Sequence, residues 1–240
     1  MTLATLAAAA DALGHPLAAE QLERFERYRA RLLEWNQKIN LTGIRDPDAF
    51  ETLHFVDSIA GLVALPDRPG LRVIDVGTGG GLPGLALKLA RPDLRLTLLD
   101  SVAKKTRVLV EIARELGLDD VEVLTGRAEE VGRDPARRES WDVAVARAVG
   151  TVVVLAELCL PLVGTGGRVV AWKKRDQKVE AELLVSGRAV SILGGRRLRP
   201  RPVDLPGLPP DRQLVMLAKE RPTPPRYPRL PGMPEHEPLV

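Results

Sequence analysis

From residue 71 onward, short apolar runs alternate with segments whose apolar residues recur at helical spacing. Short apolar runs bounded by turns indicate buried strands, and a recurrence every three or four residues indicates helices packed on them. The predicted strands cover residues 71–76, 94–100, 121–124, 141–146 and 167–172. The predicted helices between them cover residues 85–90, 103–116 and 151–160. This alternation predicts an α/β fold with a doubly wound, mostly parallel sheet.

Two later apolar segments, 189–193 and 213–218, are also predicted strands. Because no clear helix separates them, we expect them to form an antiparallel hairpin that closes the sheet.

The two ends of the chain differ from this central part. Residues 2–65 are predicted to be helical, since Leu22, Phe25, Tyr28 and Leu32 recur at helical spacing with charged residues between them. The last twenty residues hold seven prolines, which disfavour regular helix or sheet. We therefore predict a helical N-terminal extension over 1–65, the α/β domain over 66–220 and a mobile tail over 221–240.

The first predicted strand leads into a glycine-rich turn at 77–84, and a helix pattern follows at once. Glycines let a ligand approach the main chain, and the start of a helix offers unpaired N–H groups. Asp75-x-Gly77-x-Gly79-x-Gly81 resembles the first motif of S-adenosylmethionine (SAM) methyltransferases, whereas Gly79-x-Gly81-x-x-Gly84 matches the dinucleotide fingerprint. Both motifs expect an acidic residue at the end of the next strand, and Asp100 stands there.

Ligands of an open parallel sheet bind beyond the carboxyl ends of its strands. The groups that the sequence places there are Asp75, Gly77, Gly79, Gly81, Asp100, Ala128, Glu129 and Arg147. SAM would fit this set if the glycines admitted its methionine portion, Asp100 took the ribose hydroxyls, and Ala128 with Glu129 read the adenine edge. Arg147 would then hold a carboxylate or a substrate phosphate. For Asp75, capping of the turn is an equally good interpretation.

Few residues offer an activated nucleophile. Cys159 lies among leucines on a predicted helix, so we expect it in the core, which argues against carbon methylation through a cysteine. Residues 146–149 lack the Asn/Asp-Pro-Pro-aromatic pattern that suits amino-group methylation. A purine ring nitrogen needs little activation, because its lone pair can attack a sulfonium methyl directly. The sequence thus favours an enzyme that works by positioning and electrostatics, and we predict no metal site.

Basic residues follow the strand ends. The clusters are Lys104, Lys105 and Arg107, then Lys173, Lys174 and Arg175, and later Arg196, Arg197, Arg199 and Arg201. The formal net charge of +3 permits an RNA partner without requiring one. Two clusters that leave the same edge of the sheet favour a phosphate-bearing substrate.

Composition limits the location of the protein. A single cysteine cannot form an internal disulfide, which suits a reducing cytoplasm. No apolar run reaches the roughly 18 residues of a membrane span. We expect a cytoplasmic protein with no membrane partner, and a monomer.

Several motifs occur together in one order. They are Trp35-Asn36-x-Lys38-Ile39-Asn40-Leu41-Thr42, His54-Phe55-x-Asp57-Ser58, the glycine-rich turn, Leu99-Asp100-Ser101-x-x-Lys104-Lys105 and Ala146-Arg147-Ala148. This set resembles the RsmG family, also called glucose-inhibited division protein B, over about residues 22–174.

The resemblance implies a class I SAM-dependent methyltransferase fold and methylation of one guanine at N7 in 16S RNA of the small ribosomal subunit. It implies that SAM is held by the residues matching Gly77, Leu82, Ala128, Glu129 and Arg147. Arg147, Lys104 and Lys105 are the candidate catalytic residues, and the lysine pair is expected to face RNA. The Lys-Gly that the family usually has after strand five is replaced here by Trp172-Lys173-Lys174-Arg175, so either lysine could take that role.

Two other functions stay open at this point. A nicotinamide-dependent oxidoreductase would use the dinucleotide fingerprint, but the sequence lacks a convincing proton donor and a second domain. A non-catalytic RNA-binding domain with a SAM-type fold would not need the intact glycine run or Asp100.

Overall fold

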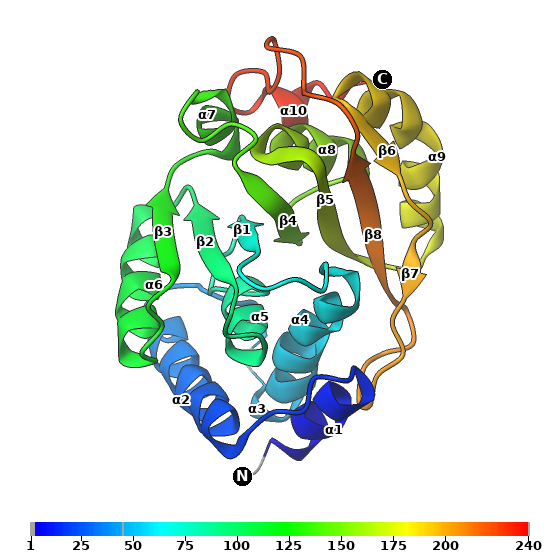
Figure 1. The fold of residues 1–240 in the computed structure, drawn as a ribbon. Coiled ribbons are helices and arrows are strands. Elements are labelled where there is room, and N and C mark those ends of the chain that lie inside the picture. The colour runs from blue at the N-terminus through cyan, green and yellow to red at the C-terminus, as the bar shows by residue number, and fades with distance from the viewer. Residues whose placement is uncertain (1–2, 45, 240) are drawn as a thin grey trace.

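The structure, a computed structural model, describes residues 3–44 and 46–239. Residues 1–2, 45 and 240, which fall in the predicted N-terminal extension and tail, lie outside the described residues. The strands form one mixed sheet in the order β3-β2-β1-β4-β5-β8-β6, with β7 paired to β8 (Figure 1). Their bounds are β1 Arg72–Val76, β2 Arg95–Asp100, β3 Val121–Thr125, β4 Trp141–Arg147, β5 Val163–Lys174, β6 Gly195–Arg197, β7 Arg201–Pro202 and β8 Arg212–Lys219.

The first five strands run parallel, and β8 is antiparallel to β5 and to β6. The prediction of a doubly wound, mostly parallel α/β sheet with an antiparallel closure is therefore confirmed.

Helices cover both faces of this sheet. The α-helices are α1 Ala4–Ala12, α2 Ala19–Asn36, α3 Pro47–Phe50, α4 Asp57–Ile59, α5 Gly84–Ala90, α6 Ala103–Glu115, α7 Ala128–Arg133, α8 Val152–Cys159, α9 Gln177–Ile192 and α10 Met233–His236. A π-helical segment η1 (Glu51–Val56) and two 3₁₀ segments, η2 (Ala60–Ala64) and η3 (Leu160–Leu162), complete the set. In Figure 1 the N-terminal helices α1 and α2 lie at one end of the molecule, and α7, α8 and α10 lie at the other.

Alternation along the strands divides the core into two layers. In β1, Val73 packs into the apolar cluster that contains α1 to α6, whereas Ile74 and Val76 pack into the cluster formed by α7, α8 and α9. Successive side chains of a strand point to opposite faces, and in the central strands both faces are buried, so β1, β2 and β4 are apolar along most of their length.

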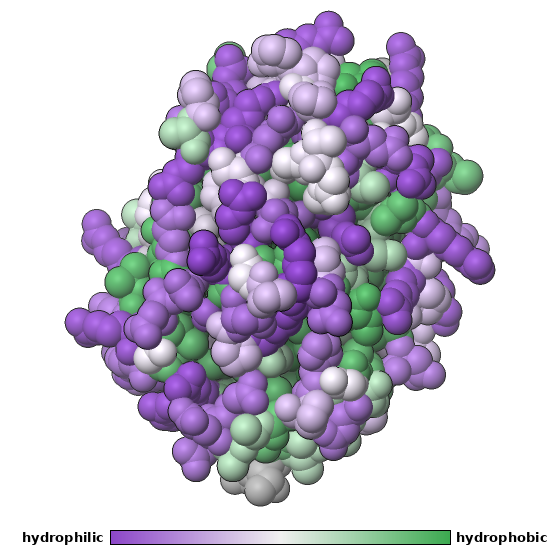
Figure 2. Space-filling view, in the orientation of Figure 1, coloured by the Kyte–Doolittle hydropathy of each residue, from purple (hydrophilic) through white to green (hydrophobic). Residues whose placement is uncertain are grey.

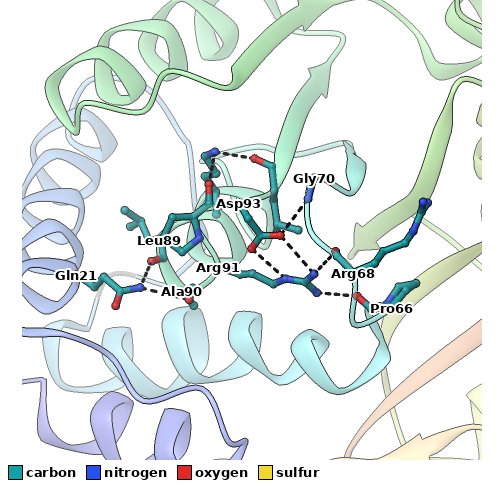
Figure 3. Close-up of polar contacts among 11 residues, drawn as sticks. Gln21, Pro66, Arg68, Gly70, Leu89, Ala90, Arg91 and Asp93 are labelled. Carbon is teal, nitrogen blue, oxygen red and sulfur yellow. Dashed lines mark hydrogen bonds and ion pairs between the residues drawn. The ribbon is translucent and has the colours of Figure 1, made fainter.

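The N-terminal helices share the core of the α/β domain. The first apolar cluster runs without a break from Leu6 of α1 to Val73 of β1, across the boundary predicted between residues 65 and 66. Figure 3 shows that Gln21 of α2 donates to the carbonyls of Leu89 and Ala90, at 2.8 and 3.3 Å, at the end of α5.

The turn before β1 is fastened to the same end of α5. Arg91 donates to the carbonyl oxygens of Pro66 and Arg68, and Asp93 accepts from the Gly70 amide (Figure 3). The helical extension thus supports the strand that leads into the glycine-rich turn.

One strand prediction is wrong. Residues 189–193 end the long helix α9 and do not form a strand, and the strand that pairs with β8 is β6, a few residues later. Val179, Ser186, Ala189 and Val190 are the buried residues of α9, so the apolar run is one part of a helical face. Asp176 accepts a hydrogen bond from the Val179 amide at 2.9 Å and caps the start of this helix.

The prolines of the C-terminal segment do not prevent packing, contrary to the predicted mobile tail. Tyr227 and Thr223 are buried, and residues 233–236 form α10. Arg138 donates to the carbonyls of Thr223 and Tyr227, at 2.6 and 2.7 Å, so a side chain satisfies main-chain groups that lack a helix or sheet partner.

The exposed surface in the view of Figure 2 is mostly hydrophilic, with apolar residues in small groups. None of the helices within the described ranges has the length and apolarity that crossing a membrane requires.

Candidate functional site

The glycine-rich turn joins the end of β1 to α5. Gly77, Gly79 and Gly81 have φ angles of +69°, +56° and +92°, a region that side-chain-bearing residues rarely adopt. A Cβ at Gly77 would lie 2.8 Å from the side chain of Val149, so glycine is also required there by the close approach of the chain after β4.

Two carboxylates hold this turn in place. Asp75 accepts hydrogen bonds from the hydroxyl of Thr78 at 2.6 Å and from the amide of Gly84 at 2.8 Å. Asp100, at the end of β2, accepts from the amide of Gly79 at 2.9 Å and from that of Val102 at the same distance. The acidic residue that both motifs expect is therefore bound directly to the turn.

Asp75 lies beneath the turn, with its side chain fully buried. Burial raises its pKa to about 6, against the opposing hydrogen bonds from Thr78 and Gly84. Of its two oxygens, Oδ1 has no hydrogen-bond partner among the residues that the structure describes. Its contacts correspond to the capping interpretation of Asp75.

The helix α2 also supports the turn, which the sequence did not indicate. The hydroxyl of Tyr28 donates to the carbonyl of Gly80 at 2.7 Å, and the side-chain oxygen of Asn36 accepts from the amides of Leu41 and Thr42. Burial raises the pKa of Tyr28 well above its usual value, so the phenol stays a hydrogen-bond donor. The sequence signal nearest to these contacts is the motif that begins at Trp35, and it does not show that the partner is the glycine-rich turn.

A pocket of about 270 Å³, called here the Asp100 pocket, opens on one side of the turn. Residues from six segments line it, among them Gly77, Asp100, Lys105, Ala128, Glu129 and Glu235. The predicted binding residues after the first three strands are thus brought together, and Glu235 from the C-terminal segment joins them. The sequence gives no sign of this last residue.

A second pocket, of about 340 Å³, opens on the other side and is called here the Arg147 pocket. Its lining includes Leu41, His54, Asp57, Gly77, Gly79, Leu82 and Arg147. Because Gly77 and Ala148 line both pockets, the two adjoin across the turn. Ala148 has a φ of +58°, a left-handed conformation that costs a non-glycine residue on the order of 1 kcal/mol.

Arg147 is held by the helical extension. It donates to Oδ2 of Asp57 at 2.8 Å, and the Leu53 carbonyl lies 3.4 Å away. Nε of Arg212, from β8, lies 3.5 Å from the other oxygen of Asp57. Asp57 belongs to one of the motifs that carry the family resemblance, whereas nothing in the sequence pointed to Arg212.

His54 is buried beside this pair and bonds to the hydroxyl of Thr42. Burial first, and then the charge of Arg147, lower its pKa to about 3. A histidine with that pKa is neutral at physiological pH, which disfavours a role as a proton donor. The main-chain carbonyl of Asp57 accepts from the indole N–H of Trp172 at 2.6 Å, and the Trp172 ring leaves no room for a Cβ at Gly61.

The predicted basic residues divide into exposed and paired ones. Lys104 and Lys174 are exposed, and Lys105 is half-buried at the Asp100 pocket. Lys173 instead donates to Glu182 at 2.9 Å and to the carbonyl of Gly150. A third hollow, of about 350 Å³, lies between Arg147, Trp172, Lys174 and Arg212.

The later arginine cluster is largely engaged in structural contacts. Arg196 pairs with Glu220, Arg197 donates to the carbonyl of Leu183, and Arg201 donates to that of Val63. These residues lie on or beside β6 and β7, away from the two pockets.

Two further sequence predictions concern chemistry. Cys159 is buried in the core as predicted, and burial raises its pKa to about 12, so it is not a reactive thiolate. Across the described ranges, no three residues of the types His, Cys, Asp and Glu are grouped so that they could hold a metal ion.

Solved structures with a similar fold include methyltransferase-type α/β proteins of low sequence identity. The branched-chain polyamine synthase of Thermus thermophilus matches with a TM-score of 0.56 and 16% identity, over 82% of this chain and 64% of its own. The Methanococcus jannaschii fibrillarin pre-rRNA processing protein matches with a TM-score of 0.52 and 12% identity, over 68% of this chain and 74% of its own. With the strand order, these matches identify the class I SAM-dependent methyltransferase (Rossmann-like) fold.

The relatives are much closer in sequence. The Moorella thermoacetica protein named ribosomal RNA small subunit methyltransferase G is 44% identical over 98% of this chain and 97% of its own length. A protein of the same name from Roseiflexus sp. is 45% identical over 96% of this chain and 97% of its own length. Residues 21–199 match the family described as GidB, rRNA small subunit methyltransferase G. The chain therefore belongs to the GidB family of rRNA small subunit methyltransferases.

Proposed function

We propose that the protein transfers the methyl group of SAM to N7 of a guanine in 16S rRNA of the small ribosomal subunit, in the bacterial cytoplasm. Membership of the GidB family supports the class of reaction and substrate. The observation that carries the proposal is the pair of adjoining pockets on either side of Gly77. One offers carboxylates and the other an arginine, which corresponds to the two chemically different ends of SAM.

The Asp100 pocket suits the adenosine part. Each oxygen of Asp100 accepts one main-chain hydrogen bond and has a second lone pair, so the carboxylate can also accept from two ribose hydroxyls. Ala128 and Glu129 line the same pocket at the start of α7, where the adenine ring would lie.

The Arg147 pocket suits the methionine part. Gly77, Gly79 and Leu82 line the pocket and would surround the methionine portion of SAM, while Asp75 supports the turn from below. Gly81, whose Cα faces Leu85 and Tyr28, contributes to the shape of the turn instead. Arg147 uses part of its set of five N–H donors on Asp57 and keeps others for a carboxylate. When bound, SAM supplies an electrophilic methyl group on a sulfonium.

The residues around the target base need only position it. The lone pair of guanine N7 forms the new bond as the carbon–sulfur bond breaks, so no side chain must first remove a proton. The neutral state of His54 and the buried Cys159 are consistent with a reaction that uses neither. We assign positioning to Arg147 and RNA contact to Lys104 and Lys105, with Lys174 in place of the family's lysine after strand five.

The experiment is methyl transfer from labelled SAM to small ribosomal subunits that lack their own modification, with the labelled nucleoside identified. The expected product is N7-methylguanosine in 16S rRNA. A different labelled nucleoside would overturn the N7 assignment. Absence of both transfer and SAM binding would overturn the proposal and return the dinucleotide and non-catalytic functions to consideration.

Assembly and domain limits also belong to the proposal. We propose a monomer whose helical extension, residues 1–65, works as part of the catalytic unit with residues 66–220. Size measurement in solution tests the first statement, because a dimer would have twice the 26.2 kDa of one chain.

A further inference from the structure

The C-terminal segment, residues 221–239, is clamped to the layer formed by α7 and α8. The guanidinium of Arg229 donates to both oxygens of Glu157, at 2.8 and 2.7 Å, and its amide donates to one of them at 2.9 Å. The Glu157 side chain, on α8, is only 1% exposed, so it has little access to water. Among the described residues, Arg229 supplies all of the hydrogen bonds that its carboxylate accepts. A buried pair with two parallel hydrogen bonds fixes position as well as charge.

The same segment then reaches the Asp100 pocket. The amide of Gly232 donates to Oε1 of Glu129 at 2.9 Å, and Glu129 is buried. Glu235, one turn further on in α10, lines the pocket together with Asp100 and Glu129. In Figure 1 the segment crosses the end of the molecule at which α7 and α8 lie.

We propose that the C-terminal segment forms one wall of the adenosine site, where Gly232 positions Glu129 and Glu235 contacts the ligand. This inference rests on the proposed function, because it takes SAM as the occupant of the Asp100 pocket. Adenosine presents hydroxyl and amino donors, and a carboxylate is a strong acceptor for both. Glu129 retains its Oε2 for the ligand while Oε1 is held by Gly232.

Gly232 has a φ of +84° at the start of α10. Among the described residues, a Cβ added there would meet only His236, at 3.5 Å, which is ordinary contact. A substitution would therefore act through the main-chain conformation that directs the amide toward Glu129. Gly117, after α6, offers a matched control, since its φ is +64° and nothing lies within 4 Å of a Cβ added to it.

The experiment measures SAM affinity by calorimetry for the full chain and for four variants. Gly232→Ala and Glu235→Ala are the test variants, and Gly117→Ala is the control for the first. Glu237→Ala is the control for the second, because Glu237 is exposed like Glu235 but is not part of the pocket lining. Loss of one hydrogen bond to a charged group predicts an increase in Kd of about 10- to 100-fold for each test variant. The two glycine variants should lose similar amounts of melting temperature without ligand, because both place alanine in a left-handed conformation.

A steady-state assay adds a readout that a purely structural role would not change. For Gly232→Ala and Glu235→Ala, we expect KM for SAM to rise while kcat at saturating SAM stays near that of the unaltered chain. Affinities equal to that of the unaltered chain in both test variants would overturn this inference and leave the proposed function intact. An equal loss of affinity in Gly117→Ala would also overturn it, since the effect would then be global. Absence of SAM binding by the unaltered chain would overturn both.

Discussion

Two buried acid–arginine pairs hold distant segments of this protein, and they differ in how fully their carboxylates are satisfied. Asp57 accepts one hydrogen bond from Arg147, and a second arginine, Arg212, stands 3.5 Å from its other oxygen. Glu157 accepts three hydrogen bonds, all from Arg229. The Asp57 pair lies at the Arg147 pocket, whereas the Glu157 pair fastens the C-terminal segment.

This difference distinguishes an ion pair at a ligand-binding site from one that only fastens two segments of the chain together. When both oxygens of a carboxylate face one guanidinium, two of its five N–H donors are paired and the orientation of the whole group is fixed. Arg147 makes its contacts to Asp57 and Leu53 through Nη1, and so Nε and Nη2 can still bind a ligand. A carboxylate shared between two arginines therefore indicates where a ligand completes the hydrogen bonding.

The largest effect on activity is expected from Arg147→Ala. Removal of a charged donor from the methionine end of the site should lower kcat/KM for methyl transfer by roughly 100-fold. The fold should persist, because Arg212 remains near Asp57 and offsets part of the exposed charge. Activity is measured on small subunits, and folding by circular dichroism.

Arg212→Ala is the matched control for this prediction, since Arg212 also faces Asp57. If both variants retained full activity, Asp57 and its arginines would have a purely structural role, like the pair of Glu157 and Arg229. The proposed difference between the two pairs would then be wrong.

The largest effect on stability is expected from Arg229→Ala. It leaves Glu157 buried without its partner, which costs about 3 kcal/mol of unfolding free energy, or roughly 6–12 °C in melting temperature. Activity at saturating SAM should change far less than in Arg147→Ala. Thermal unfolding and steady-state kinetics measure the two effects on one preparation.

Arg226→Ala is the control, because Arg226 is exposed and lies over the Tyr227 ring at 5.1 Å. Its loss should cost under about 1 kcal/mol. An equal loss of stability in Arg226→Ala and Arg229→Ala would show that the Glu157 pair does not carry the attachment.

The lysines extend the same comparison to RNA. Lys104 is exposed, and Lys105 lines the Asp100 pocket, whereas Lys173 is bound to Glu182. We expect the change of Lys104 and Lys105 together to alanine to weaken RNA binding by about 10-fold. The slope of log affinity against log salt concentration should become shallower by about one to two, because one or two phosphate contacts are lost. Lys173→Ala should leave the salt dependence unchanged. Filter binding across a salt series measures this, and equal slopes for all variants would contradict it.

The sequence predicted most of the features that depend on residues close together in the chain. The order of β1, the glycine turn, α5 and β2 follows from apolar runs and glycine spacing, and Asp100 then falls beside Gly79 because neighbouring parallel strands end together. In contrast, Tyr28 meets Gly80 across 52 residues and Glu129 meets Gly232 across 103, contacts that depend on how whole layers pack. The apolar run at 189–193 was ambiguous for a similar reason, since a short run fits a strand or one face of a helix.

The smallest effect expected is a pH dependence localised at the Asp57 pair. The folded protein keeps His54 neutral with a pKa of about 3, while the unfolded chain takes up a proton near pH 6.5. The unfolded state therefore binds more protons between these values, and stability is lost as the pH falls through that window. His54→Gln should remove this term, so its unfolding free energy should fall less steeply than that of the unaltered chain, by about 1 kcal/mol per pH unit below pH 6. Denaturant unfolding between pH 4.5 and about pH 8 measures it. Parallel curves would mean that His54 can be protonated in the folded state, and that the environment of the Asp57 pair is as accessible to water as an ordinary surface pair.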